Sequence, residues 1–406
     1  MWPWAKRTLP YAAMVLISAW LASRAASMGD WDTDSYPAVH ALASGQIGAY
    51  FEATPMMGPF STLVQAPFAA LSGGSQQELY RWASFPCLLA VGLLGLYLAA
   101  VARRRGASPL TQMVLALVPL LNPITFEAMK LGHPEELLAS ALAIAAIASA
   151  SEGHRTRSAV LLGLAVASKQ WALIAVLPAL MALPGGRLRA AAIAAAVAAL
   201  LMLPGVAAAP DGFMEVNGKA ADTGRVVTPW SVWYPAASSV TETYRVDGRR
   251  LIAHVEEAPP LVGSLSHPLI LLMAIGLPVA LALRRGRVGL SGSEAMVLFA
   301  LLALLRCALD PVDNFYYHEP LLLALVGWDA FTSCRLPLRS LAGVGVALIF
   351  ARAWSNISDP VAFNLVYLAV ATGLGYALVS SLFGRFGWTG VPVSAFFAER
   401  SPNFRD

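Results

Sequence analysis

The sequence is short of charged residues and of cysteine. Only 13% of its 406 residues are Asp, Glu, Lys or Arg, whereas 57% are hydrophobic. A soluble domain of this length needs far more polar surface, so the composition excludes one and makes the bilayer the solvent. The three cysteines, Cys87, Cys307 and Cys334, lie far apart in or beside apolar segments. Their spacing predicts neither a disulfide framework nor a zinc site.

Motifs of other protein classes are missing as well. The sequence has no nucleotide-binding motif and no internal repeat of the kind found in many secondary transporters. It has no H-E-x-x-H or other compact ligand set, so we expect no metal and no other cofactor. Arg24 interrupts the place where a cleavage site would follow the apolar run from Leu9 to Leu21, which favours a retained first helix over a signal peptide.

Long apolar runs fill most of the chain. Crossing about 30 Å of hydrocarbon takes roughly 20 helical residues. The sequence therefore predicts a single all-α polytopic membrane domain over residues 1–406, with about twelve transmembrane helices. The predicted spans are Leu9–Ser27, Tyr80–Ala102, Pro109–Phe126, Glu136–Ser151, Ser158–Ser168, Trp171–Leu183, Arg189–Val206, Pro268–Leu283, Glu294–Leu309, Pro320–Phe331, Leu338–Ala353 and Val361–Phe383.

Basic clusters between these runs predict the topology. With both termini in the cytoplasm, every compact basic cluster falls on the cytoplasmic side, as the positive-inside rule requires. Most acids, and every histidine except His154, then lie on the extracytoplasmic face. The cytoplasmic basic residues are Lys6, Arg7, Arg103, Arg104, Arg105, Arg155, Arg157, Arg187, Arg189, Arg284, Arg285, Arg287, Arg335, Arg339, Arg385, Arg400 and Arg405.

Two extracytoplasmic loops are long. The first, residues 28–79, contains the apolar segment Gly58–Leu71, which is too short to span and suits a re-entrant or interfacial helix. The second, residues 207–267, contains Trp230, Trp233 and Tyr234, so we expect it to be ordered and to roof a cavity.

Three carboxylates, Asp30, Asp32 and Asp34, lie within five residues of the first loop. One interpretation is a solvated loop that obeys charge sidedness. The other is a general base at the membrane surface, since a carboxylate held there can accept the proton of an attacking hydroxyl. Tyr36 and the apolar segment that follow favour the second interpretation.

A series of short motifs follows in order along the chain. They are Asp32-x-x-x-Tyr36, Ala41-Leu42-x-x-Gly45, Tyr50, the segment from Pro59 to Pro67-Phe68, and Leu162-Gly163-Leu164-Ala165-x-x-x-Lys169-Gln170-Trp171. In this order and topology the sequence resembles the polyprenyl-phosphate-dependent glycosyltransferases of the GT-C superfamily. It is most similar to glycosyltransferase family 87, which includes actinobacterial mannosyl- and arabinofuranosyltransferases.

The resemblance implies a GT-C-type helical bundle in a bacterial plasma membrane, with an extracytoplasmic active site. It further implies a polyprenyl-phosphate sugar as donor, with mannose as the first guess, a glycolipid or cell-envelope glycan as acceptor, and inversion at the anomeric carbon. The family places its catalytic aspartate four residues before Tyr36, which selects Asp32. Asp30 and Asp34 flank it, so the base is open among the three. Tyr36 is expected to contact substrate.

Lys169 interrupts an apolar run from Ala159 to Leu183. An ionised lysine at helix depth is costly unless it reaches the interface or finds an anion. It is either a lysine at a kink that extends to the outer surface or, as the resemblance favours, a cation for the donor phosphate. Trp171 is then placed to line the lipid or sugar path.

Two further polar segments lie on the outer face. His133 and Glu135 stand at a helix entrance, where proline and paired glutamates are also ordinary first-turn residues, and are candidates for substrate binding. Arg306 precedes a polar and aromatic turn that runs from Asp310 to Pro320. Turn formation and an interfacial aromatic belt explain much of that turn. We expect His318, with Arg306 and Tyr317, to bind the donor phosphate and stabilise the leaving group.

The competing hypothesis is a multi-pass transporter or lipid flippase. Such proteins carry membrane-buried charges at corresponding places in two halves, whereas the polar residues here concentrate at one face. A purely structural membrane scaffold would not need the three-acid loop. The expected partners are therefore membrane lipids, the lipid-linked donor and the acceptor, and not nucleic acid.

Overall fold

The computed structural model describes residues 3–26, 29–53, 58–221, 226–246, 249–286, 289–332 and 336–384. Cys334, Arg287, Arg335 and the basic C-terminal residues lie outside these ranges. The first half contains α1 (Pro3–Arg24), α2 (Asp30–Asp34), α3 (Tyr36–Ala43), α4 (Ile47–Ala53), α5 (Pro59–Ala69), α6 (Gln76–Arg104), α7 (Pro109–Leu117), α8 (Pro123–Leu131), α9 (Pro134–Ser151), α10 (Arg155–Ser168), the 3₁₀ helix η1 (Gln170–Ala175), α11 (Val176–Ala182), α12 (Arg187–Ala208) and α13 (Pro210–Ala221).

The second half adds one hairpin to a further set of helices. Its elements are the 3₁₀ helix η2 (Tyr234–Ala236), β1 (Ser238–Val246), β2 (Arg249–Glu257), α14 (Pro260–Arg285), α15 (Gly292–Leu309), the 3₁₀ helix η3 (Phe315–His318), α16 (Glu319–Phe331), α17 (Leu338–Trp354) and α18 (Pro360–Phe383).

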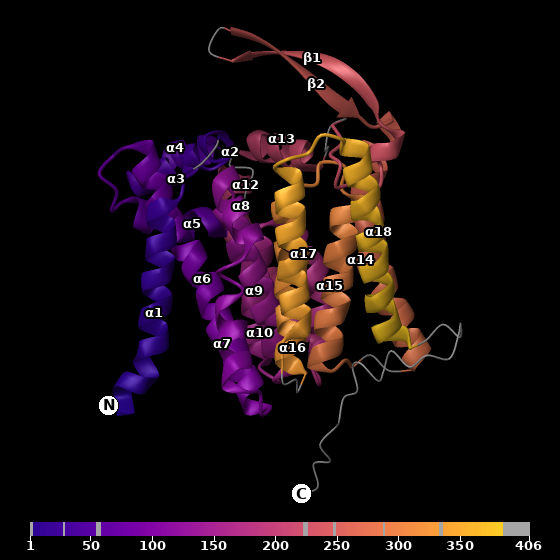
Figure 1. The fold of residues 1–406 in the computed structure, drawn as a ribbon. Coiled ribbons are helices and arrows are strands. Elements are labelled where there is room, and N and C mark those ends of the chain that lie inside the picture. The colour runs from indigo at the N-terminus through magenta and orange to yellow at the C-terminus, as the bar shows by residue number, and fades with distance from the viewer. Residues whose placement is uncertain are drawn as a thin grey trace, which may run out of the picture.

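The long helices form a bundle with two chemically different ends (Figure 1). The short helices α2, α3, α4 and α13 lie across one end, which we call the acidic end because α2 carries Asp30, Asp32 and Asp34. Helices α6 and α14 finish at the opposite end, where their last turns carry arginines. Acids and basic clusters are therefore separated along the bundle axis, in agreement with the sequence pattern.

Among the described residues, six helices, α6, α9, α12, α14, α15 and α18, are long and apolar enough to cross a membrane. Each corresponds to one of the twelve predicted spans. The predicted span Pro109–Phe126 is instead divided into α7 and α8. Its Asn122 accepts hydrogen bonds from the backbone N–H groups of Ile124 and Thr125, and Pro123 follows, so a new helix begins there. The remaining predicted spans include α10, α16 and α17, which have 14, 13 and 17 residues.

The segment expected to form a re-entrant or interfacial helix is α5, which has 11 residues. Its N-terminus is bound to the end of α10, because the Gly58 N–H donates to the Ser168 carbonyl at 3.0 Å. A Cβ at Gly58 would collide with the Ala167 carbonyl, so only glycine permits this approach. Its depth in a membrane stays a prediction.

The all-α expectation is wrong in the long loop. Strands β1 and β2 pair antiparallel, with Ser238 opposite Glu257, and the hairpin extends over the acidic end (Figure 1). The β-branched residues of β1 favour an extended chain. As expected, the described part of the loop is structured. The Asn364 side chain donates to the Pro229 and Ser231 carbonyls, at 3.0 and 2.9 Å, and so ties the loop to α18.

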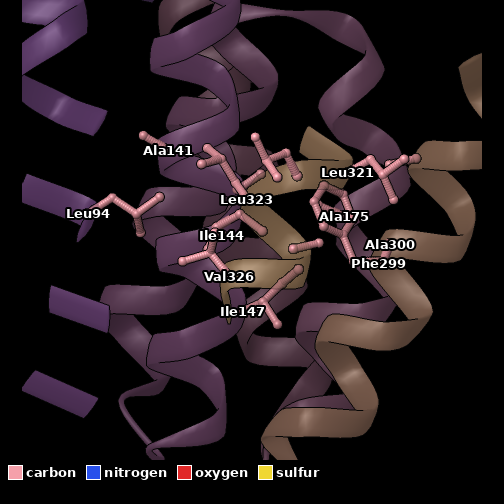
Figure 2. Close-up of a cluster of buried hydrophobic side chains, with 14 of the residues drawn as sticks. Leu94, Ala141, Ile144, Ile147, Ala175, Phe299, Ala300, Leu321, Leu323 and Val326 are labelled. Carbon is pink, nitrogen blue, oxygen red and sulfur yellow. The ribbon is translucent and has the colours of Figure 1, made fainter. Parts of the chain in front are cut away.

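The apolar core surrounds α9, which packs against α6, α10, α11, α15 and α16. In the most apolar 18 residues of α9, 83% of the residues are buried, whereas in the corresponding stretch of α12 only 11% are buried. Helix α9 is therefore an interior helix and α12 an outer one. Figure 2 shows side chains from five elements meeting in this core. They include Leu94, Ala141, Ile144, Ile147, Ala175, Phe299, Ala300, Leu321, Leu323 and Val326.

The contact of α6 with α7 provides a test of this packing. A Cβ at Gly95 would collide with the Ala116 carbonyl, a backbone atom that cannot turn aside. We expect Gly95→Ala to destabilise the protein by about 1–3 kcal/mol, the usual cost of overpacking. Gly276→Ala is the matched control, because its Cβ meets no atom within 4 Å and alanine favours a helix. Equal thermal unfolding temperatures for the two variants in detergent would contradict this packing.

Candidate active site

Lys169 lies at a break between two helices. Helix α10 ends at Ser168, Lys169 is extended with φ −149° and ψ 132°, and η1 begins at the next residue. The break brings the lysine to the first turn of α9. Its Nζ lies 3.1 Å from Glu135 Oε1 and 3.4 Å from Glu136 Oε1, and both carboxylates are buried. Lys169 thus finds anionic partners within the protein, as its position in an apolar run requires.

His133 connects this ion pair to the acidic helix α2. Its Nδ1 lies 3.0 Å from Glu135 Oε1, and its Nε2 lies 3.2 Å from Asp30 Oδ2. Burial of the ring lowers the pKa of His133, but the hydrogen bonds to Asp30 and Glu135 outweigh it and raise the pKa to about 9. The imidazole is therefore a cation at neutral pH that donates from both nitrogens. Its ring also stacks on Tyr316, with centroids 4.6 Å apart.

The three aspartates do not all lie on one face of α2. Asp30 and Asp34 are four residues apart and share one face, whereas Asp32 points away from it. Asp30 contacts His133, and Asp34 is half-buried within the fields of His133 and Lys169. Burial raises the pKa of Asp34 above its ordinary value. Asp32 is exposed, and no contact joins it to these cations within the described part of the chain.

Trp31 holds α2 in this orientation. Its ring is fully buried and packs against Tyr36 and Tyr80, at centroid distances of 5.4 and 5.1 Å. Tyr36 is thereby fixed at the edge of the site, beside α2. The burial of one aromatic ring turns a five-residue helix into a rigid support for Asp30 and Asp34.

Trp171 and Arg306 continue the cluster away from α2. The Trp171 Nε1–H donates to Glu136 Oε2 at 2.7 Å. The Arg306 guanidinium lies over the rings of Trp171 and Tyr317, at 5.0 and 4.3 Å, and donates to the Tyr317 carbonyl at 3.4 Å. Arg306 is only 6% exposed, yet among the described residues no carboxylate forms an ion pair with it. A buried cation without an ion-pair partner favours an anionic ligand.

The structure does not bring His318 into this cluster. Its Nδ1 lies 3.1 Å from the Phe315 carbonyl oxygen, its Nε2 lies 2.9 Å from the Tyr367 hydroxyl, and its ring packs against Trp230. The phosphate-binding role predicted for His318 gains no contact with Lys169 or Arg306.

Two neighbours of the predicted residues enter the cluster instead. The sequence pattern selects Glu135 and not Glu136, although Glu136 directly follows Glu135 and lies three residues after His133. Tyr316 fitted an interfacial aromatic belt in the sequence, but it is 3% exposed and stacked on His133. Only the fold shows that α8, α9 and η3 meet at this point.

Comparison with known proteins identifies the family of the chain. Residues 57–308 match glycosyltransferase family 87, and this is well over half of the chain. The chain belongs to glycosyltransferase family 87, and is therefore a membrane glycosyltransferase of the GT-C type. None of the curated proteins matches it.

Two solved structures are similar to the whole chain. One is a crystal structure of ArnT from Cupriavidus metallidurans bound to undecaprenyl phosphate, with 16% identity, a TM-score of 0.46, and coverage of 94% of this chain and 71% of that one. The other is the archaeal oligosaccharyltransferase AglB from Archaeoglobus fulgidus in complex with an inhibitory peptide and a dolichol-phosphate. It has 14% identity, a TM-score of 0.41, and coverage of 95% of this chain and 57% of that one.

Substitution of Glu135 tests whether the charges of this cluster stabilise one another. It contacts both His133, which is buried, and Lys169, which is partly buried, so Glu135→Gln removes one of the two carboxylate partners of each cation. We expect a loss of about 3–5 kcal/mol, as for breaking a buried ion pair. Glu127→Gln, in the exposed pair with Lys130, should cost less than about 1 kcal/mol. Thermal unfolding in detergent measures both, and a neutral Glu135→Gln would show that the cluster is not a cooperative unit.

Proposed function

We propose that the enzyme transfers a sugar from a polyprenyl-phosphate donor to a glycolipid or cell-envelope glycan, with inversion at the anomeric carbon. The observation that carries the proposal is Arg306, a buried guanidinium that makes no ion pair with a described carboxylate and lies between two aromatic rings. It lies next to a cluster that also contains Lys169, His133 and the acids of α2. A site with an unpaired cation on one side and carboxylates on the other suits a phosphate leaving group and a hydroxyl nucleophile.

The donor phosphate is assigned first to Arg306. The charge of Lys169 is already shared between Glu135 and Glu136, so its field at a phosphate is reduced. The planar guanidinium, by contrast, donates several parallel N–H groups and suits phosphate oxygens. Trp171 and Tyr317 offer apolar ring faces on which the first prenyl units can lie. Lys169 then supports the second charge of the departing polyprenyl phosphate.

The general base is assigned to Asp34. Asp30 is occupied by His133, and Asp32 is exposed and faces away, although the family spacing selects it. Burial raises the Asp34 pKa toward working pH, which strengthens it as a base while it remains ionised. The acceptor oxygen forms a bond to the anomeric carbon as the bond from that carbon to the phosphate oxygen breaks. The hydroxyl proton passes to Asp34, and polyprenyl phosphate leaves with the bonding electrons.

The acidic end is assigned to the extracytoplasmic face of a bacterial plasma membrane. The arginines in the last turns of α6 and α14 support this assignment through the positive-inside rule. Mannose is the first choice of sugar, in keeping with the resemblance to family 87 mannosyltransferases. A transporter or flippase is disfavoured, because the charged cluster contacts α2 through His133 and Asp30, and α2 lies across the acidic end of the bundle (Figure 1).

Substitution of each aspartate tests the base. We expect Asp34→Asn to lower kcat by about 10²- to 10⁴-fold, the usual contribution of a general base. Asp32→Asn, the matched control on the same helix, should retain activity within about 3-fold, since an exposed surface change is nearly neutral. The assay follows radiolabelled polyprenyl-phosphate mannose into a glycolipid acceptor. Loss of transfer in Asp32→Asn alone would return the role to Asp32.

The pH profile of the wild type gives an independent check on the same groups. Activity should rise with pH as Asp34 ionises, above the ordinary Asp value, because burial raises its pKa. The ion pairs of His133 are fully present below its unperturbed pKa of 6.5 and are lost as pH rises through about 9. Transfer should therefore fall near pH 9, and His133→Gln should remove this basic limb.

The role of Arg306 is tested with the donor concentration varied. We expect Arg306→Gln to raise the KM for the polyprenyl-phosphate sugar by roughly 10- to 100-fold, the loss of hydrogen bonds to a charged group. Arg352→Gln is the control, because this exposed arginine lies on α17 outside the cluster. An unchanged donor KM would remove Arg306 from the phosphate site. If no sugar transfer occurs with any donor and proteoliposomes take up substrate, the transporter hypothesis is correct.

A further inference from the structure

Three side chains of types that bind metals, Cys307, Asp313 and His318, lie close together next to Arg306 and Tyr317 in the sequence. Cys307 lies in the last turn of α15, Asp313 in the following turn and His318 at the end of η3. One donor atom from each lies within 4.8 Å of the others, and all three side chains are buried. Their spacing, with five and four residues between successive ligands, matches no compact metal motif, so sequence alone does not predict a site here.

Asp313 is the feature that calls for a ligand. Its side chain is fully buried, and neither carboxylate oxygen makes a hydrogen bond of normal geometry to a described residue. The Nε2 atom of His318 lies 3.7 Å from Asp313 Oδ2, which is beyond hydrogen-bonding distance. A buried carboxylate whose oxygens accept no hydrogen bond is costly, and a bound cation is one of the few ways to compensate it.

His318 is oriented as a metal-binding imidazole. Its Nδ1 lies 3.1 Å from the Phe315 carbonyl oxygen and so carries the proton, which leaves the lone pair on Nε2. A backbone carbonyl on the second nitrogen is the usual support of a ligating histidine. The Nε2 atom faces Asp313 Oδ2 at 3.7 Å and the Tyr367 hydroxyl at 2.9 Å, so two oxygens lie beside it.

We propose that Cys307, Asp313 and His318 bind a zinc ion, with the Tyr367 hydroxyl or a water as the fourth ligand. Zinc accepts this mixture of sulfur, imidazole and carboxylate in tetrahedral geometry, whereas magnesium and calcium take oxygen ligands. Two ligands about 2.1 Å from a tetrahedral zinc lie about 3.5 Å apart, close to the 3.7 Å between His318 and Asp313. The Cys307 thiol now donates to the Tyr317 carbonyl. On binding it becomes a thiolate, and its proton passes to solvent.

The proposed zinc is structural. Its ligands lie on both sides of the turn that carries Tyr316 and Tyr317, and Arg306 immediately precedes one of them. A closed four-ligand site fixes this turn against α15, so that Tyr316 stacks on His133 and Tyr317 lies under Arg306. Metal binding is measured without any sugar donor, so its outcome does not depend on the proposed reaction.

The first experiment is a metal analysis of the full-length protein, purified in detergent without chelator. We expect roughly one zinc per chain in the wild type. Cys307→Ser, Asp313→Asn and His318→Gln should each lose at least about tenfold in zinc affinity, as for loss of a metal ligand or its close support. Cys87→Ser is the matched control, because Cys87 is also buried but lies in α6 outside the cluster. Zinc content equal in the wild type and all three ligand variants would overturn the proposal.

Cobalt substitution covers the case in which a ligand variant fails to fold. In the wild type, Co²⁺ replacing zinc should give the visible absorption of a tetrahedral site together with a thiolate-to-cobalt charge-transfer band. Both should persist in Cys87→Ser. Chelator should lower the wild-type unfolding temperature, and zinc but not magnesium should restore it. If Asp313 is simply a buried neutral acid, the cobalt spectrum will show no thiolate band and chelator will have no effect, which excludes the site.

Discussion

The contact of Lys169 with Glu135 and Glu136 is the interaction on which the rest of the site depends. It joins the break after α10 to the first turn of α9, and each glutamate extends it in a different direction. Glu135 contacts His133, which contacts Asp30 of α2. Glu136 accepts a hydrogen bond from Trp171, whose ring lies under the Arg306 guanidinium. Desolvating such charges is expensive, and a well-packed apolar cluster of the same volume is often at least as stable. The charges are therefore better explained by the reaction than by stability.

The same connections distribute the charge unequally. On the side of α2, Asp30 and Glu135 surround the His133 cation, so that side is rich in carboxylates. On the side away from α2, the Arg306 guanidinium contacts the rings of Trp171 and Tyr317, and no described carboxylate forms an ion pair with it. In the transfer that we propose, an acceptor hydroxyl loses a proton on one side of the sugar while a phosphate gains charge on the other. The asymmetry of the cluster matches that requirement, and an inverting displacement needs the two groups on opposite faces of the anomeric carbon.

The sequence predicts the helices better than it predicts their breaks. Apolar length places α6, α9 and α15 within a few residues, because a bilayer demands continuous hydrogen-bonded helix. The division at Asn122 and the hairpin in the long loop depend on local capping and strand pairing that hydropathy ignores.

In the site, Lys169 and Glu135 are conspicuous as charges in apolar runs. Spacing cannot choose among Asp30, Asp32 and Asp34, since the choice depends on which face of α2 the burial of Trp31 turns inward. The sequence suggests His318 as a partner of Arg306 because both flank one turn, but His318 contacts Phe315 and Tyr367, whereas Arg306 contacts Trp171 and Tyr317.

The position of the cluster along the bundle follows from the same electrostatic costs. Helix α9 has 18 residues and so extends about 27 Å, close to the thickness of the hydrocarbon layer, and its charged residues lie in its first turn. At that depth a buried charge is near headgroups and water, where its desolvation costs less than at the bilayer centre. The polyprenyl-phosphate donor that we propose would lie at the same depth, with its chain in the hydrocarbon and its phosphate at the surface. With such a donor, neither the charges of the protein nor the phosphate has to cross the apolar layer. The reacting groups would then meet where the free-energy cost of desolvating them is smallest.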